Sequence, residues 1–248
     1  TNISMEGGML KVSIAGSPAT TGNLIMTDTD LTVLEGAGST IEAVTDGHAD
    51  FGTLKFGEAG SASGMLSISA GAEDYVSFAT TTIDDDGAQA IGINNDSIVH
   101  LLDGIDFGGL ATARTFVKDG GADLLIMGSK VHNVGAGGAT LRVEGGRLIG
   151  SHASNPYGDG TILNIAGGEI VLASDLNGSN PDVTYDNPVV VDGGGTLTAG
   201  AGGIGVSGAN VAITNAAGDS IVLNSGLLAL KTTDGYTLTI LKDITGVT

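Results

Sequence analysis

Acidic and amide side chains gather in one part of the sequence, where they could bind a divalent cation. The segment TIDDDG, residues 82–87, places Asp84, Asp85 and Asp86 in a run that ends at a glycine, and the segment NND follows at residues 94–96. Carboxylate and amide oxygens in a glycine-containing loop suit Ca²⁺. The spacing is not that of an EF-hand, whose longer loop closes with a Glu. Two interpretations stay open: a calcium site at the three aspartates, and a solvated acidic turn. No other cofactor is predicted.

Carboxylate pairs elsewhere could perform general acid–base chemistry. Asp28 and Asp30 alternate with threonines, which on a strand would place both carboxylates on one face, and Asp103 and Asp106 form a looser pair. Two carboxylates of this kind can cleave a glycosidic bond. Glycan-active sites also combine acids with basic groups and aromatic rings, whereas this chain has no Trp and its nine Lys and Arg are scattered. An enzyme is therefore the alternative hypothesis rather than the first.

The histidines and cysteines provide no recognisable catalytic or metal-binding motif. His48, His100, His132 and His152 are separated by 52, 32 and 20 residues, and no closely spaced histidine pair or GxSxG nucleophile motif occurs. The chain has no cysteine, which excludes disulfides, zinc–thiolate sites and thiol nucleophiles. We expect the histidines to be surface residues.

A short phrase that occurs twice predicts the fold. Residues 139–149 read ATLRVEGGRLI, and residues 161–171 read TILNIAGGEIV, 22 positions further on. Each copy is an alternating strand, a glycine pair and a second strand. A strand–turn–strand period of about 20 residues is typical of a β-solenoid, because each coil buries its apolar face only by stacking on its neighbours. The predicted interior pairs are Leu141 with Leu163, Val143 with Ile165, and Leu148 with Ile170.

Composition supports one folded all-β unit. Glycine makes up 43 of the 248 residues without a three-residue period, which excludes collagen. Hydrophobic residues make up 41% and are mostly aliphatic, which is enough apolar surface to fold. No linker-like segment interrupts the pattern, so we predict a single continuous β-rich domain over residues 1–248. The predicted fold class is all-β, a parallel β-solenoid (β-helix), with a two-sheet β-sandwich or jelly roll as the alternative.

The charge balance bears on partners and location. The 28 Asp and Glu against nine Lys and Arg give a formal net charge of −19. Nucleic acids and anionic membranes are bound by clustered basic residues, so we expect neither as a partner. No apolar run approaches the roughly 18 residues of a membrane span. The chain starts with Thr1 rather than Met, which we interpret as a processed or excised N-terminus of an exported protein.

Two polar segments interrupt the strand pattern. Residues 151–160 (SHASNPYGDG) and 173–188 (ASDLNGSNPDVTYDNP) flank the second copy of the repeat and contain three of the four prolines. We interpret them as loops that protrude from one side of the solenoid, where solenoids place binding surfaces. A decorated turn without a binding role is the equal alternative.

Four phrases carry a resemblance to a known class of protein. They are TLRVEGGRLIG, ILNIAGGEIVLAS, GGGTLTAGAGGIGVSGANVAITN and SIVLNSGLLAL, and they run from about Asp119 to the C-terminal end. They resemble the glycine-rich strand repeats of bacterial autotransporter passengers and related secreted β-helical surface proteins. The resemblance implies a parallel β-helix that acts as an adhesin, fibre or coat, although a minority of such proteins are enzymes.

Both ends of the sequence consist of apolar strands without a polar capping helix. The open ends of a solenoid leave backbone groups that another strand can pair with, and a head-to-tail contact of this kind builds filaments. Within residues 1–15 we expect a subunit-exchanging strand that contacts a second copy of the chain. Its predicted assembly residues are Met9, Leu10, Val12 and Ile14.

The first functional hypothesis follows from the predicted fold and its open ends. It is an extracellular, cell-surface structural or adhesive protein, not an enzyme, that self-assembles into a filament, fibre or coat by terminal strand pairing. Its partners would be copies of itself and a glycan or cell surface. A carbohydrate-active β-helix lyase or hydrolase, and a viral or phage coat or fibre protein, are the alternatives.

Overall fold

The chain forms strands throughout the part that the structure describes. The computed structural model describes residues 1–13, 23–34, 38–44, 47–57, 64–70, 75–84, 91–109, 111–127, 131–151, 155–173, 183–200, 210–214, 221–233 and 235–246. No helix occurs within these ranges, and so none that could cross a membrane. The strands are β1 (Asn2–Met5), β2 (Gly8–Ser13), β3 (Leu24–Met26), β4 (Asp30–Val33), β5 (Ser39–Val44), β6 (Ala49–Phe56), β7 (Met65–Ser69), β8 (Tyr75–Ile83), β9 (Ile91–Asn95), β10 (Ile98–Leu101), β11 (Arg114–Asp119), β12 (Asp123–Met127), β13 (Ala139–Val143), β14 (Arg147–Ser151), β15 (Ile162–Leu172), β16 (Val183–Tyr185), β17 (Val189–Ala199), β18 (Val211–Ile213), β19 (Ile221–Ser225), β20 (Leu228–Thr232), β21 (Leu238–Ile240) and β22 (Ile244–Gly246).

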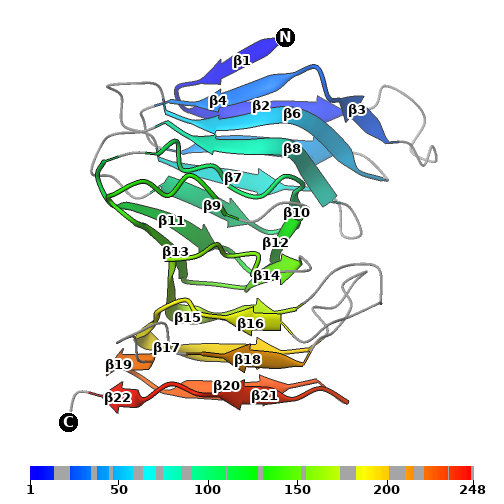
Figure 1. The fold of residues 1–248 in the computed structure, drawn as a ribbon. Coiled ribbons are helices and arrows are strands. Elements are labelled where there is room, and N and C mark those ends of the chain that lie inside the picture. Colours follow the sequence, from blue (N-terminus) through cyan, green and yellow to red (C-terminus); the bar gives the residue numbers. More distant parts are fainter. Residues whose placement is uncertain are drawn as a thin grey trace.

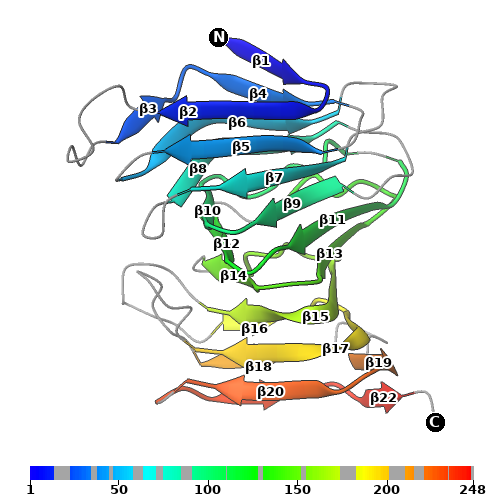
Figure 2. The ribbon, with the colours of Figure 1, turned by 180° about the vertical axis from the view of Figure 1, so that it is seen from behind.

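The strands stack in parallel as a β-solenoid, which confirms the predicted fold class. The first strands lie at one end of the stack and the last strands at the other (Figures 1 and 2). Strand pairing defines three faces. Face A consists of β2, β5, β7, β9, β11, β13, the first part of β15 and of β17, β19 and β22. Face B consists of β3, the first part of β6 and of β8, β10, β12, β14, the second part of β15 and of β17, and β20. Face C consists of β1, β4, the ends of β6 and β8, and the separate sheet of β16, β18 and β21.

Aliphatic side chains fill the interior in columns that run from coil to coil. In β13, residues alternate between the buried interior and the half-buried outer side, as the period of a strand requires. The three predicted pairs are in register and buried: Leu141 with Leu163, Val143 with Ile165, and Leu148 with Ile170. Each coil therefore buries its apolar face against the next, which is the main stabilising contribution of a solenoid.

The number of residues per coil varies along the chain. Leu141 pairs with Leu163, 22 positions later, whereas Val189 pairs with Ile221, 32 positions later. The 22-residue spacing of the repeated phrase is therefore that of one coil and not a constant period. Stacking requires that the strands stay in phase, whereas the connections between them can differ in length.

Polar ladders on the outside of face A also join the coils. The carboxylate of Asp192 accepts hydrogen bonds from Asn164 Nδ2 (2.7 Å) and Asn224 Nδ2 (2.8 Å), one residue from the coil on either side. These two bonds, with the nearby Arg142 guanidinium, hold the pKa of Asp192 below its ordinary value. Outward side chains therefore add specific bonds between coils.

One interior position of face A holds a lysine. Lys118 lies in register between Ile93 and Val143 and has no exposed surface. Its ammonium donates hydrogen bonds to the carbonyls of Asp119 (2.6 Å), Gly120 (3.0 Å) and Gly145 (3.0 Å). Burial lowers the pKa of Lys118 to about 8, so the side chain still carries its proton at neutral pH. It binds together the turns that join faces A and B in two successive coils.

Gly92 in β9 is required because the neighbouring backbone leaves no room for a side chain. A Cβ at this position would lie 1.9 Å from the carbonyl oxygen of Val117. Gly92→Ala should therefore force β9 and β11 apart and lower the free energy of unfolding by about 1–3 kcal/mol. Chemical denaturation measures this. Gly121→Ala is the matched control, because a Cβ there meets no atom within 4 Å. Equal stabilities of the two variants would contradict the packing of β9 on β11.

Candidate functional site

The predicted calcium ligands are only partly within the described residues. Asp84, at the end of β8, forms an ion pair with Lys55 (2.8 Å), and Asp85 and Asp86 lie outside the described residues. Asn95 is buried and donates to the carbonyls of Ser97 and Asp123, so its amide links strands. Among the residues that the structure describes, no group of three His, Asp or Glu could hold a metal ion. The calcium site stays a prediction, and one of its three carboxylates already has a basic partner.

One carboxylate of each pair, that of Asp30 and that of Asp106, makes a local structural contact. Asp30 Oδ1 accepts the backbone N–H of Thr53 (2.8 Å), and the backbone carbonyl of Asp28 accepts the N-terminal amine. Asp106 Oδ1 accepts the backbone N–H of Gly108 (2.7 Å), and its other oxygen lies 3.6 Å from His132 Nε2. These contacts hold loops and strand ends in place.

The described parts of the two polar segments pack against the core at several positions. Tyr157 is fully buried, and its hydroxyl donates to the carbonyls of Leu148 (3.2 Å) and Val171 (2.7 Å). Asn187 is also fully buried and donates to the carbonyls of Gly158 and Thr161. Residues 152–154 and 174–182 lie outside the described residues, so a binding role for those portions stays a prediction.

A stack of three rings on the outer side of face B brings together residues that are far apart in the sequence. The rings of His48 and Tyr75 are parallel with centroids 4.6 Å apart, and those of Tyr75 and His100 lie 4.3 Å apart at an interplanar angle of 20°. His48 immediately precedes β6, Tyr75 begins β8, and His100 lies in β10. We call these three residues the ring stack. It spans three successive coils.

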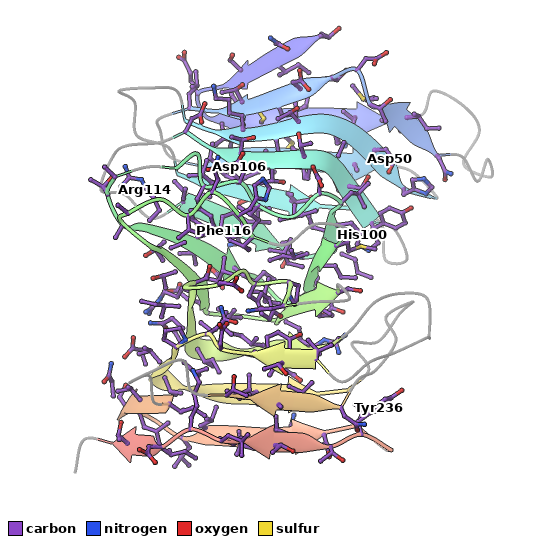
Figure 3. All side chains as sticks on the ribbon, in the orientation of Figure 1. Asp50, His100, Asp106, Arg114, Phe116 and Tyr236 are labelled. Atoms are coloured by element: carbon purple, nitrogen blue, oxygen red, sulfur yellow. The ribbon has the colours of Figure 1, made fainter. Side chains whose placement is uncertain are left out.

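A carboxylate and a hydroxyl lie beside the ring stack. Asp50, Ser77 and His100 occupy one column of register across β6, β8 and β10, and Figure 3 shows Asp50 and His100 on the same side of the solenoid. Ser77 Oγ donates to Asp50 Oδ1 (2.5 Å), and His48 Nε2 lies 3.1 Å from Asp50 Oδ2. Because the Ser77 proton is donated to the carboxylate, this cluster lacks the Ser-to-His hydrogen bond of an acyl-transfer triad.

The electrostatics of the ring stack favour the neutral forms of His100 and Tyr75. Burial lowers the pKa of His100 to about 4, an effect that the Asp50 carboxylate partly offsets and His48 reinforces. Burial, together with the charge of Asp50, raises the pKa of Tyr75. At neutral pH the His100 imidazole and the Tyr75 phenol are therefore both uncharged, and the stack is held by ring contact rather than by an ion pair.

The sequence reasoning missed the ring stack because it treated the histidines as isolated. His48 and His100 are 52 residues apart. The register advances by 27 residues from β6 to β8 and by 23 residues from β8 to β10, so Tyr75 is level with His48. His100 lies two positions beyond Ile98, the residue level with Tyr75. Tyr75 therefore follows His48 by one coil and precedes His100 by another. That these three rings lie in neighbouring positions of successive coils can be deduced from the sequence only when the length of each coil is known.

The hydrophobic core is incompletely covered at both ends of the solenoid. Most of the described residues that pack against the core while staying half-buried belong to the first or last coils, namely Ile3, Leu10, Leu24, Met26, Leu223, Leu228, Leu238 and Ile240. Large exposed apolar side chains follow the same distribution: Met9 and Ile25 at one end, and Leu227, Leu230, Leu241 and Ile244 at the other, with only Leu102 between them among the described residues.

The predicted assembly residues have different environments within β2. Met9 points outward and is 64% exposed, Leu10 packs half-buried against the core, and Val12 is buried. Ile14 lies outside the described residues. Met9 and Leu10 therefore offer apolar surface in the first coil, whereas Val12 already packs within the chain.

Comparisons with protein-family models, with curated proteins and with solved structures find no match to this chain. The solenoid architecture is therefore established by strand pairing alone, and the likeness to autotransporter passengers remains a hypothesis drawn from the repeat phrases.

Proposed function

We propose that this protein is an extracellular structural or adhesive surface component whose copies associate end to end. The single observation that carries the proposal is the uncovered core in the first and last coils. Leu230 is in register with Leu197, which is fully buried, yet Leu230 is 45% exposed. Ile244 is in register with the fully buried Ile221, yet it is 52% exposed. Both side chains lie in columns of the interior, and a further coil stacked on the last one would bury them.

The first coil carries side chains that could provide this layer. On face C, the interior columns end in Ile3 and Met5 at one end and in Leu238 and Ile240 at the other. A second copy whose first coil lies on the last coil would continue these columns, and its β1 would pair with the open edge of β21. Edge strands with unpaired backbone groups favour such additions. Because the two surfaces lie at opposite ends of the molecule (Figure 1), the contact is head to tail and does not close.

The net charge sets the conditions for this association. Each copy carries a formal charge of −19, so copies repel one another at low ionic strength. Salt at physiological concentration screens charges beyond about 8 Å, whereas burial of apolar side chains does not weaken with salt. End-to-end association should therefore increase with ionic strength.

Two substitutions in the last coil test the proposal. Leu230→Asp combined with Ile244→Asp should abolish association, because it places charges in the contact. Both side chains are about half exposed, so the variant should fold. Sedimentation velocity and negative-stain electron microscopy at increasing protein concentration should show linear particles for the unmodified chain and monomers for the variant.

A charge-matched variant provides the control. Leu102 is 41% exposed but lies in the middle of the solenoid. Leu102→Asp combined with Thr140→Asp, on the outer side of β13, adds the same two negative charges away from both ends and should assemble like the unmodified chain. A monomeric unmodified chain at high concentration, or equal assembly of the last-coil variant, would refute end-to-end association.

A further inference from the structure

The ring stack fastens three coils on the outer side of face B. Tyr75 contacts His48 of the preceding coil and His100 of the following coil through its two ring faces. Asp50 adds a hydrogen bond from Ser77 and a contact with His48. Side-chain contacts therefore reinforce the backbone ladder between β6, β8 and β10.

Few charged groups act on the His100 imidazole. From β6 and the residue before it come the carboxylate of Asp50 and the imidazole of His48, and β8 contributes the Tyr75 phenol. The next strand, β12, places the apolar side chain of Leu125 in register with His100. Among the described residues, the carboxylate of Asp50 lies near both imidazoles, and it already accepts a hydrogen bond from Ser77.

We infer that the ring stack is an acid-sensitive clasp, which holds the coils of β6, β8 and β10 together while His100 is neutral and loosens when His100 gains a proton. A charged imidazole in this position would lose hydration. The compensating carboxylate in the described part of the chain is that of Asp50, which also contacts His48. Loosening would begin on the outer side of face B and leave the interior columns in place.

The direction of the pH effect follows from proton linkage. Burial lowers the pKa of His100 in the folded chain to about 4 from its ordinary value of 6.5. Between these values the unfolded chain binds more protons than the folded chain, so the contribution of His100 to stability is complete above pH 6.5 and is lost as the pH falls towards 4.

Nuclear magnetic resonance of the histidine ring protons tests the electrostatic part of the proposal. The His100 signal, assigned by its absence from His100→Phe, should titrate with a midpoint near pH 4 in the folded protein. Asp50→Asn should move the midpoint lower, because the carboxylate favours the charged ring. A midpoint at or above 6.5, or a higher midpoint in the amide variant, would overturn the assignment.

Hydrogen exchange tests the structural part. Relative to the intrinsic exchange rates, amides of β8 and β10 should lose protection between pH 6.5 and 4 in the unmodified chain, while those of β13 and β15 keep it. His100→Phe retains a ring for stacking but cannot titrate, so its β8 and β10 amides should stay protected. His132→Phe is the control. His132 lies beside Asp106 on face C, so this variant should behave like the unmodified chain. Equal loss of protection in His100→Phe would show that other groups cause the opening.

Discussion

Replacing Leu141 with Asp should lower the free energy of unfolding by about 4 kcal/mol or more, because a carboxylate would enter the interior without a partner. Leu141 is fully buried, and its neighbours in register are Phe116 and Leu163, both apolar. Every coil depends on the one beside it, so the effect should reach beyond β13. Urea denaturation monitored by far-ultraviolet circular dichroism measures it.

Two variants of the same strand serve as comparisons. Thr140→Asp places the new charge on the outer side of β13, where it stays hydrated, and should change stability by no more than about 0.5 kcal/mol. Val143→Asp should be milder than Leu141→Asp, because Val143 lies in register with Lys118 and a basic group is available to the new carboxylate. Similar losses for Thr140→Asp and Leu141→Asp would mean that the inward and outward positions are assigned incorrectly.

Lys118→Met should destabilise the chain by about 2–4 kcal/mol. The substitution keeps a long side chain in the interior but removes the donor to three backbone carbonyls. A hydrogen bond from a charged donor contributes about 1.5–3 kcal/mol. The unfavourable desolvation of the ammonium cancels part of this sum. Chemical denaturation at pH 7 measures the change. Lys11→Met is the control, since the ammonium of Lys11 is exposed and its partner among the described residues is Glu42; its effect should be about 0–1 kcal/mol.

The pH dependence of the same pair of proteins gives an independent check. Burial lowers the pKa of Lys118 to about 8 from 10.5. Between these values the unfolded chain binds more protons than the folded chain, so the unmodified protein should gain stability relative to Lys118→Met as the pH rises through this window. A constant difference between the two proteins from pH 8 to 10.5 would show that the lysine is hydrated and not enclosed by the turns.

The fold was predictable because its cause is local and repeated. Each copy of the phrase contains the apolar alternation that buries one side of a strand and the glycine pair that turns the chain, so Leu141 and Leu163 could be paired without a structure. The same reasoning does not extend to Lys118, because a basic residue in a strand normally indicates an outward position. Only the arrangement of the neighbouring turns explains why it faces inward.

The ring stack was not predictable from residue types and spacing. Its members lie in coils whose register advances by 27 and then 23 residues, whereas the repeated phrase has a spacing of 22. A period taken from that phrase therefore does not bring His48, Tyr75 and His100 to the same outer position. Long-range contacts in a solenoid depend on the sum of all the connections between the residues, and a single sequence does not reveal where those connections lengthen.

The unequal coils have a consequence for engineering. The coil that separates Val189 from Ile221 accommodates ten more residues than the one that separates Leu141 from Leu163, and both pairs still stack in register. The length of a coil can thus differ while the strands keep their register, so we expect the solenoid to accept peptide inserts between its faces. Epitopes or short recognition peptides grafted at successive corners would be displayed as a regular array, at intervals of about 4.8 Å along the axis.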